Sequence, residues 1–241
     1  MQLVAESIYR LGRKHHNFYA VVDGRRVTVI DAGGSRELPL LEAGLQSIGL
    51  GLNAVEAVLL THGHSDHVGF AREVSESGVP VMAHEAEAAF LTDGSRGSQV
   101  QPMDLPLWRR QTMAFLAEMI RAGAAQEYRL RSVQTLTDGE VVDIPGKPRT
   151  LATPGHTAGH AAYILEDRRV VFSGDALVTD GLIHSATGPQ MLGDVFHHDV
   201  ALARASLRRF GGQSTDVLLP GHGTPWYGPI AQAVAQARAA L

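Results

Sequence analysis

One sequence pattern constrains the fold more than any other: short apolar runs end abruptly in glycine, histidine or aspartate. Each run has the length and the β-branched or leucine-rich composition of a buried strand, and each tail has turn-forming residues. If such strands lie side by side, their carboxyl ends bring the tails to one edge of a sheet. The five runs are Val27 to Ile30, Ala57 to Leu60, Thr150 to Ala152, Val170 to Phe172 and Val217 to Leu219.

Hairpins and helices fit between these strands. We predict one hairpin around Asp23-Gly24, a pair that tolerates positive φ, and another around Glu166-Asp167. Apolar residues at helical spacing predict helices over 38–48 and 200–210, and a third from Pro229 towards the end of the chain. Strands and helices interleave throughout, so we predict an α/β protein with a single domain over residues 1–241.

The segment from about 94 to 131 departs from this pattern and reads as a helical insert. Its apolar residues fall on one helical face. That face either packs on the core or covers the active site and shapes an apolar pocket, and both interpretations stay open. The residues of this face are Trp108, Thr112, Phe115, Leu116 and Met119.

The composition excludes several kinds of site and partner. The chain has no cysteine, so histidine and carboxylate must hold any metal. A formal net charge of -4 without a basic block gives no electrostatic reason to bind nucleic acid. No apolar stretch approaches the ~20 residues that cross a membrane, and the start of the chain lacks the apolar core of a signal peptide. We therefore expect a cytoplasmic protein that acts on a small-molecule substrate.

Residues 61 to 69 are dense in potential metal ligands, which are His62, His64, Asp66 and His67. In extended backbone, residues two apart point the same way, so His62 and His64 can bind one ion. Asp66 and His67 follow as the chain turns into a helix, where they face a second ion nearby. Imidazole and carboxylate without thiolate suit zinc, and also manganese, iron or cobalt.

Three further candidate ligands lie at strand ends. Each follows a small residue, which lets the backbone approach a metal closely. They bring the candidate ligands to seven, enough for two divalent metal ions, and they are His156, Asp175 and His222.

In combination these motifs resemble the metallo-β-lactamase-fold hydrolase superfamily, and the resemblance extends from the turn at Asp31 to the final helix. It implies a four-layer αββα sandwich of two mixed β-sheets, with a dinuclear metal site at one edge. The motifs are Thr61-His-Gly-His-Ser-Asp-His67, Thr153-Pro-Gly-His-Thr-Ala-Gly-His160, Ser173-Gly-Asp175 and Pro220-Gly-His-Gly223.

The resemblance also implies a role for each ligand. The first metal would be held by His62, His64 and His156. The second would be held by Asp66, His67 and His222, and Asp175 would bridge the two.

Other polar residues receive weaker interpretations. Asp31 matches a family position that supports the metal loop, as hydrogen bonding to a ligand would also predict. His160 is either a supporting residue beside His156 or an ordinary structural histidine. The remaining histidines divide into two sets: His184, His197 and His198 face the substrate or the solvent, whereas His15, His16 and His84 are structural or surface residues.

Two cations about 3.5–4 Å apart would lower the pKa of a shared water and supply hydroxide at neutral pH. The hydroxide would attack a carbonyl or phosphorus while the metals stabilise the developing charge. Asp66, or a metal-bound water, would return a proton to the leaving group, and Asp175 would hold the two cations together. Asp66 and Asp175 are therefore the predicted catalytic residues.

Differences from known branches of the superfamily narrow the range of reactions that this chain is expected to catalyse. Typical zinc β-lactamases lack the aspartate at Asp175, and related lactonases carry a tyrosine where this chain has Val178. Glyoxalase II enzymes have a basic helical region that the short segment after His222 does not provide. We predict hydrolysis of a small ester, thioester or lactone by a metal-bridging hydroxide. The alternatives are a phosphodiesterase or nuclease, a mononuclear iron sulfur dioxygenase, a β-lactamase and a non-catalytic metal-binding protein.

Overall fold

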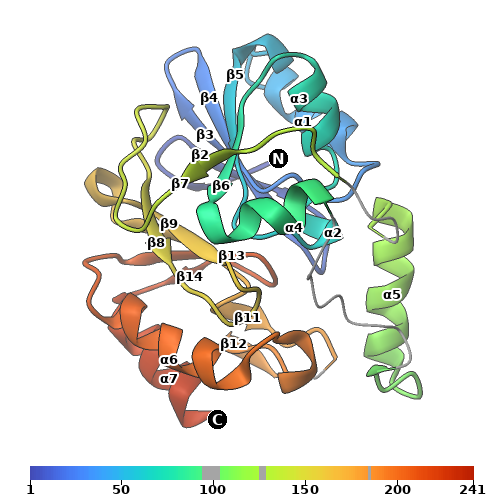
Figure 1. The fold of residues 1–241 in the computed structure, drawn as a ribbon, viewed down its shortest axis with the longest axis vertical. Helices are drawn as coiled ribbons and strands as arrows, with labels where there is room; N and C mark the ends of the chain where they lie inside the picture. The colour runs from blue at the N-terminus through green and yellow to red at the C-terminus, as the bar shows by residue number, and fades with distance from the viewer. Residues whose placement is uncertain (94–103, 125–128, 184–185) are drawn as a thin grey trace.

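The structure, a computed structural model, describes residues 1–93, 104–124, 129–183 and 186–241. Two mixed β-sheets pack face to face, and helices cover their outer faces (Figure 1). The first sheet contains, in spatial order, β1 (Gln2–Ala5), β2 (Ile8–Gly12), β3 (Asn17–Asp23), β4 (Arg26–Ile30), β5 (Val55–Leu59), β6 (Val81–His84) and β7 (Gln134–Leu136). The second contains β14 (Trp226–Tyr227), β13 (Val217–Pro220), β10 (Val170–Gly174), β9 (Ala161–Leu165) and β8 (Arg149–Ala152). A separate ribbon pairs β11 (Val178–Asp180) with β12 (Thr187–Gln190).

The helices lie on the outside of the two sheets or beside the ribbon. The α-helices are α1 (Leu38–Gln46), α2 (Ser65–Val68), α3 (Ala71–Glu76), α4 (Ala88–Asp93), α5 (Arg110–Ala122), α6 (Val200–Gly211) and α7 (Ile230–Ala239). Short 3-10 helices are η1 (Leu52–Ala54), η2 (Glu85–Glu87), η4 (Glu166–Arg168) and η5 (Asp194–Phe196). Within the described part of the chain, no helix is long and apolar enough to cross a membrane.

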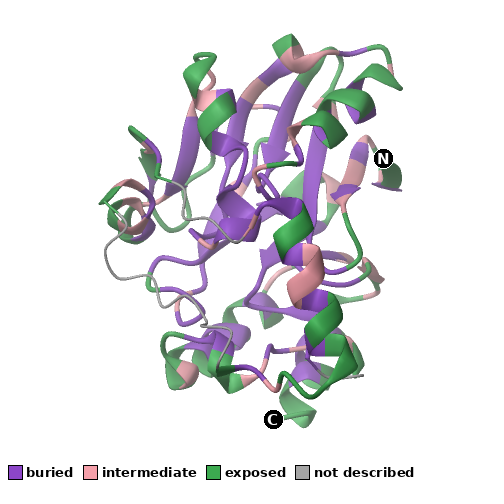
Figure 2. Cartoon of the chain, turned by 90° about the vertical axis from the view of Figure 1, so that its right-hand side faces the viewer, coloured by how far each residue is buried: buried purple, intermediate pink, exposed green. Residues whose placement is uncertain are grey.

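Three apolar layers hold these elements together, as the buried strands of Figure 2 indicate. Successive residues of a strand point to opposite faces of its sheet. Phe18 of β3 therefore packs with Leu41 under the helices on one face, whereas Tyr19 packs with Phe172 between the sheets. A third layer, which includes Phe210, joins the second sheet to α6 and α7. Helix, sheet, sheet and helix make up the predicted four-layer αββα sandwich.

The five predicted strands are β4, β5, β8, β10 and β13, and they divide between the two sheets. β4 runs parallel to β5, and β10 runs parallel to β13, so each pair delivers two tails to the same edge. Backbone hydrogen bonds then join the sheets at that edge, from Ala161 N to Thr61 O (2.9 Å) and from Asn17 N to Gly221 O (2.8 Å). The tails of both sheets consequently meet at one place.

The predicted hairpins exist, but their turns differ. The first turn falls on Gly24-Arg25, one residue later than predicted, because Asp23 still pairs with Arg26. The second is longer than two residues, because η4 and a left-handed Arg169 (φ 55°) lie between β9 and β10. The three predicted helices correspond to α1, α6 and α7.

The predicted helical insert contains α5, but its boundaries differ from the pattern. Phe115 and Met119 are buried, and Leu116 packs against them. Trp108 lies before the helix and is 83% exposed, so its predicted place on the buried face is wrong. The reason is a turn around Pro106, whose carbonyl accepts a hydrogen bond from the backbone N–H of Arg109 and breaks the helical register. Residues 94–103 and 125–128 of the insert lie outside the described residues.

Candidate metal centre

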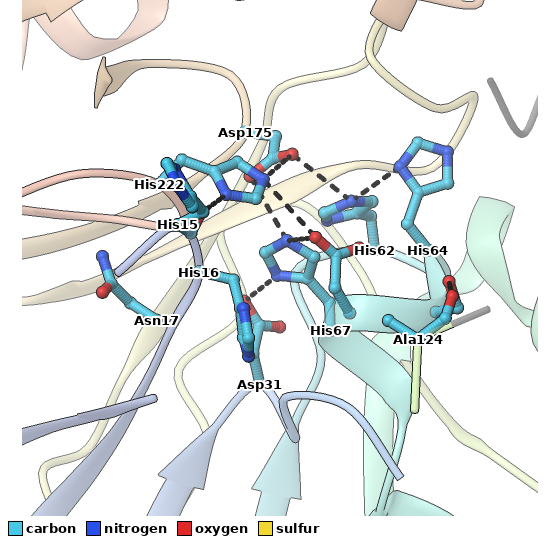
Figure 3. Close-up of polar contacts among 12 residues, drawn as sticks. His15, His16, Asn17, Asp31, His62, His64, His67, Ala124, Asp175 and His222 are labelled. Atoms are coloured by element: carbon cyan, nitrogen blue, oxygen red, sulfur yellow. Dashed lines mark hydrogen bonds and ion pairs between the residues drawn. The ribbon is translucent and has the colours of Figure 1, made fainter. Parts of the chain in front are cut away.

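All seven side chains predicted as ligands lie together where the tails of the two sheets meet. Figure 3 shows five of them, His62, His64, His67, Asp175 and His222. They arrive from five places along the chain. The segment after β5 provides His62 and His64, α2 provides Asp66 and His67, and the segments after β8, β10 and β13 provide His156, Asp175 and His222.

The first cluster consists of three imidazoles and one carboxylate: His62, His64, His156 and Asp175. Nδ1 of His64 lies 3.1 Å from Nε2 of His62 and 2.9 Å from Nε2 of His156. Oδ2 of Asp175 lies 3.3 Å from Nε2 of His156. These atoms point at a common centre.

The second cluster consists of one carboxylate and two imidazoles: Asp66, His67 and His222. Oδ2 of Asp66 lies 3.8 Å from Nε2 of His67 and 3.7 Å from Nε2 of His222. The carboxylate of Asp175 belongs to this group as well, because its Oδ1 lies 3.4 Å from Nε2 of His67 and its Oδ2 lies 3.0 Å from Nε2 of His222. One aspartate therefore contacts both clusters.

These residues fit a metal site on three observations. Donor atoms bound tetrahedrally to zinc at 2.0–2.1 Å are separated by roughly 3.3 Å, close to the separations found here. Among the described residues, the buried atoms Nε2 of His67 and Oδ1 of Asp175 have no hydrogen-bond partner. Such orphaned atoms in the interior are costly unless a ligand satisfies them. The donor set of imidazole and carboxylate suits a divalent cation.

Three ligand rings are oriented through their second nitrogen, as metal-binding histidines require. Nδ1 of His62 lies 3.0 Å from Oγ1 of Thr61, and Nδ1 of His67 lies 2.8 Å from Oδ2 of Asp31. Nδ1 of His222 donates to the main-chain carbonyl of His15. Each contact leaves Nε2 of the ring facing the centre.

Asp31 links the loop that begins at Thr61 to the second cluster. Besides contacting His67, its Oδ1 accepts a hydrogen bond from the backbone N–H of Thr61 at 2.7 Å. Its backbone is left-handed (φ 60°), a conformation that aspartate tolerates better than most residues. Strain of this kind concentrates at functional sites.

The electrostatics of the two clusters differ. Burial holds the pKa of His62 and of His156 well below the ordinary value, so both rings are neutral and able to bind a metal. Burial also lowers the pKa of His67, but nearby carboxylates, first among them Asp175, outweigh it and raise the pKa to about 10. Burial raises the pKa of Asp175, but His222 and His67 more than compensate and hold it well below its ordinary value. Without a metal, the protonated ring of His67 thus balances the ionised carboxylate of Asp175. A bound cation would take the place of that positive charge.

Among the other histidines, His160 and His197 lie beside the centre. Nε2 of His160 accepts a hydrogen bond from the backbone N–H of Asp175 at 3.0 Å, and burial lowers the pKa of this ring to about 3. The buried ring of His197 lies 5.4 Å from that of His156. The side chain of His198 is exposed, and that of His84 accepts a hydrogen bond at the start of η2. His184 lies outside the described residues.

Sequence reasoning missed two groups that contact the ligand loops. The first is the carbonyl of His15, a residue that the sequence predicts to be structural or at the surface. The second is Glu87, a fully buried carboxylate that accepts hydrogen bonds from both ligand loops of the first cluster. Nothing in the local sequence marks either residue, since both act through contacts with distant segments.

The family model described as the metallo-beta-lactamase superfamily matches residues 11–222. The chain belongs to this superfamily. Curated relatives of this chain include proteins with functional names. The probable metallo-hydrolase YflN of Bacillus subtilis is 31% identical over 211 residues, which span 83% of this chain and 76% of the relative. Hydroxyacylglutathione hydrolase GloC of Haemophilus influenzae is 30% identical over 162 residues, 66% of this chain and 65% of the relative.

Solved structures agree with this assignment. A metallo-beta-lactamase family protein of Thermus thermophilus has a TM-score of 0.70 and 25% identity, covering 97% of this chain and 79% of that one. A metallo-beta-lactamase of Cronobacter sakazakii has a TM-score of 0.68 at 19% identity, covering 97% and 89%, and this likeness concerns the fold alone. The chain is a metal-dependent hydrolase of the metallo-β-lactamase superfamily, with two His/Asp clusters consistent with its metal site.

Proposed function

We propose that this protein hydrolyses a small, partly apolar ester, thioester or lactone with two divalent cations, most suitably zinc. One observation carries the proposal: Asp175 contacts His156 of the first cluster and His67 and His222 of the second through a single carboxylate. A carboxylate shared in this way holds two cations close together against their mutual repulsion. The first cation would be held by His62, His64 and His156, the second by Asp66, His67 and His222, with Asp175 between them.

Two such cations, when bound, lower the pKa of a shared water and polarise the group under attack. The protein's own residues do the rest. His62, His67 and His222 are buried and their rings are held by hydrogen bonds at Nδ1, so they exclude solvent from the inner side of the centre. Asp66 is the more accessible carboxylate, with 12% of its side chain exposed against 3% for Asp175. Asp66 therefore faces the open side, where we propose that it passes a proton to the leaving group during turnover.

An apolar cluster beside the centre supports a partly apolar substrate. It joins Phe115 and Met119 of α5 to Leu182, Ile183 and Phe196 of the segments after β11 and β12. The ring of Phe115 lies 6.1 Å from that of His15, whose carbonyl holds a ligand ring. We propose that α5 borders the active-site mouth and that this cluster sets substrate preference through burial and shape.

The comparisons favour acyl chemistry over the alternatives. The relative from Haemophilus influenzae is named a hydroxyacylglutathione hydrolase, which describes hydrolysis of an acyl compound. The net charge of -4 gives no electrostatic reason to bind a polyanion. We propose that the substrate is a small molecule and that the protein has no nucleic-acid partner. We also propose that residues 1–241 form one domain and that the protein acts in the cytoplasm.

Metal analysis combined with a substrate panel tests the proposal. We expect two equivalents of zinc per chain, loss of activity on chelation and its return when zinc is added. Turnover of esters, thioesters or lactones should exceed that of β-lactams and phosphodiesters. One tightly bound iron with thiol-dependent oxygen consumption, or a preference for phosphodiesters, would contradict the proposal.

A further inference from the structure

Glu87 is a buried carboxylate that does not belong to either metal cluster. It ends η2 and is 1% exposed. Oε1 accepts a hydrogen bond from the backbone N–H of Gly63 at 2.7 Å. Oε2 accepts one from Oγ1 of Thr157 and one from the backbone N–H of Gly159, both at 2.9 Å. Each oxygen of this carboxylate therefore serves a different loop.

The two loops are those that provide the imidazoles of the first cluster. Gly63 lies between His62 and His64 in the loop that follows β5 of the first sheet. Thr157 directly follows His156 in the loop that follows β8 of the second sheet. The carboxylate of Glu87 thus joins ligand loops from two different sheets.

Two glycines allow this close approach. A Cβ on Gly159 would collide with the backbone nitrogen of Glu87. A Cβ on Gly63 would lie 2.8 Å from Cε1 of Phe90, in the helix that follows Glu87, and 3.2 Å from Oε1 of Glu87. Both loops are pressed directly against the segment from η2 to α4, so a shift of this segment would move them.

The ionised carboxylate of Glu87 can accept all three of these hydrogen bonds. Glutamine instead presents an N–H donor on one side, which cannot accept a hydrogen bond. That donor would face either the N–H of Gly63 or the donors of Thr157 and Gly159. Burial raises the pKa of Glu87 to about 7 against the effect of these hydrogen bonds, and positive charge in the adjacent clusters would favour the ionised form.

We propose that Glu87 is the positioning residue of the first metal site, which fixes the loops of His62, His64 and His156 relative to one another. It parallels Asp31, which links Thr61 to His67 and so supports the second cluster. The inference rests on the proposed dinuclear function, because it assigns Glu87 to one of two metal sites. Groups that orient metal ligands affect metal affinity by 10- to 100-fold.

The test measures metal binding in Glu87→Gln, with Glu85→Gln as a matched control on the exposed side of the same 3-10 helix. Zinc affinity is measured by competition with a chromophoric chelator, and the cobalt-substituted protein is examined by absorption spectroscopy. We expect Glu87→Gln to lower the affinity for one equivalent of zinc by about 10- to 100-fold. It should also alter the absorption spectrum of the cobalt bound at that site alone. Glu85→Gln should match the wild type.

Two further variants assign the effect to a site. In an Asp66→Asn background, which weakens the second site, Glu87→Gln should still reduce the affinity of the remaining metal. In a His64→Ala background, which removes a first-site ligand, Glu87→Gln should add little. Thr157→Val removes one of the three hydrogen bonds with little change in shape. It should lower the affinity for the same equivalent of zinc by a smaller factor, and it tests the inference even if Glu87→Gln fails to fold.

Unchanged zinc affinity and cobalt spectra in Glu87→Gln and Thr157→Val would overturn the inference while leaving the dinuclear function intact. Loss of stability without any change in metal binding would also overturn it, because Glu87 would then support the fold alone. If the wild-type protein bound fewer than two metals, the proposed function and this inference would fail together.

Discussion

Nδ1 of His222 donates a hydrogen bond to the main-chain carbonyl of His15, a residue 207 positions earlier in the chain. The side chain of Asn17 strengthens the same junction, because its amide donates to the carbonyls of Pro220 and Gly223 at 2.8 and 2.9 Å. The segment between β2 and β3 therefore holds the loop that carries His222. It also fixes which nitrogen of that ring faces the metal centre.

Glu37 keeps this segment in place and provides a first prediction. It is fully buried and accepts hydrogen bonds from Nε of Arg13 at 2.7 Å, from His16 and from the backbone N–H of Gly34 at 3.0 Å. Removing one partner of a buried charged network costs about 3–5 kcal/mol. Glu37→Gln should lower the free energy of unfolding by that order in urea titrations and weaken zinc binding at the second site. Glu42→Gln, on the exposed face of α1, should do neither.

Asp175 provides a second prediction. Asp175→Ala should reduce the bound zinc to one equivalent or less and lower kcat by at least about 100-fold, because no other carboxylate among the described residues contacts both clusters. Asp66→Asn should chiefly weaken the second metal. Elemental analysis after gel filtration, together with steady-state kinetics, measures both effects. Two tightly bound metals and full activity in Asp175→Ala would exclude a bridging role.

A third prediction compares two aromatic residues of the insert. Phe115 is buried and its ring lies 6.5 Å from that of Phe196, whereas Trp108 is 83% exposed. Phe115→Ala should lower the free energy of unfolding by about 3 kcal/mol and change KM for apolar substrates. Trp108→Ala should change stability by no more than about 0.5 kcal/mol. Thermal denaturation and kinetics on both variants measure this. Identical KM values for Phe115→Ala and the wild type would show that α5 does not border the substrate.

The pKa of Glu87 provides a fourth prediction, for the metal-free protein. Burial raises this pKa from 4.5 to about 7, so the folded protein binds more protons than the unfolded chain between these values. The stability that Glu87 contributes is complete below about pH 4.5 and is lost as the pH rises through about 7. The loss amounts to roughly 3 kcal/mol over the whole window.

Urea unfolding from pH 5 to 8 measures this effect. The free energy of unfolding of the wild type, relative to that of Glu87→Gln, should fall as the pH rises, because glutamine does not titrate. The Glu85→Gln control should follow the wild type throughout. A constant difference between wild type and Glu87→Gln over this range would show that the pKa of Glu87 is not raised.

The elements that depend on local pattern can be predicted from the residues alone. Runs such as Val27 to Ile30 are almost wholly apolar because both faces of each central strand are buried, and they were recognisable without the structure. The ligand-rich loop from His62 to His67 was also recognisable without the structure, because its donors are close in sequence. Helices such as α6 followed from apolar spacing alone.

How these pieces support one another depends on long-range contacts that no local pattern encodes. The carbonyl of His15 and the carboxylate of Glu87 look ordinary in the sequence, because their role depends on loops that packing brings to them from other parts of the chain. Trp108 shows the converse: it fits a helical pattern, yet the turn at Pro106 removes it from the helix. Local residues fix strands and donors, whereas burial and the direction of a single hydrogen bond are set by contacts between segments far apart in the chain.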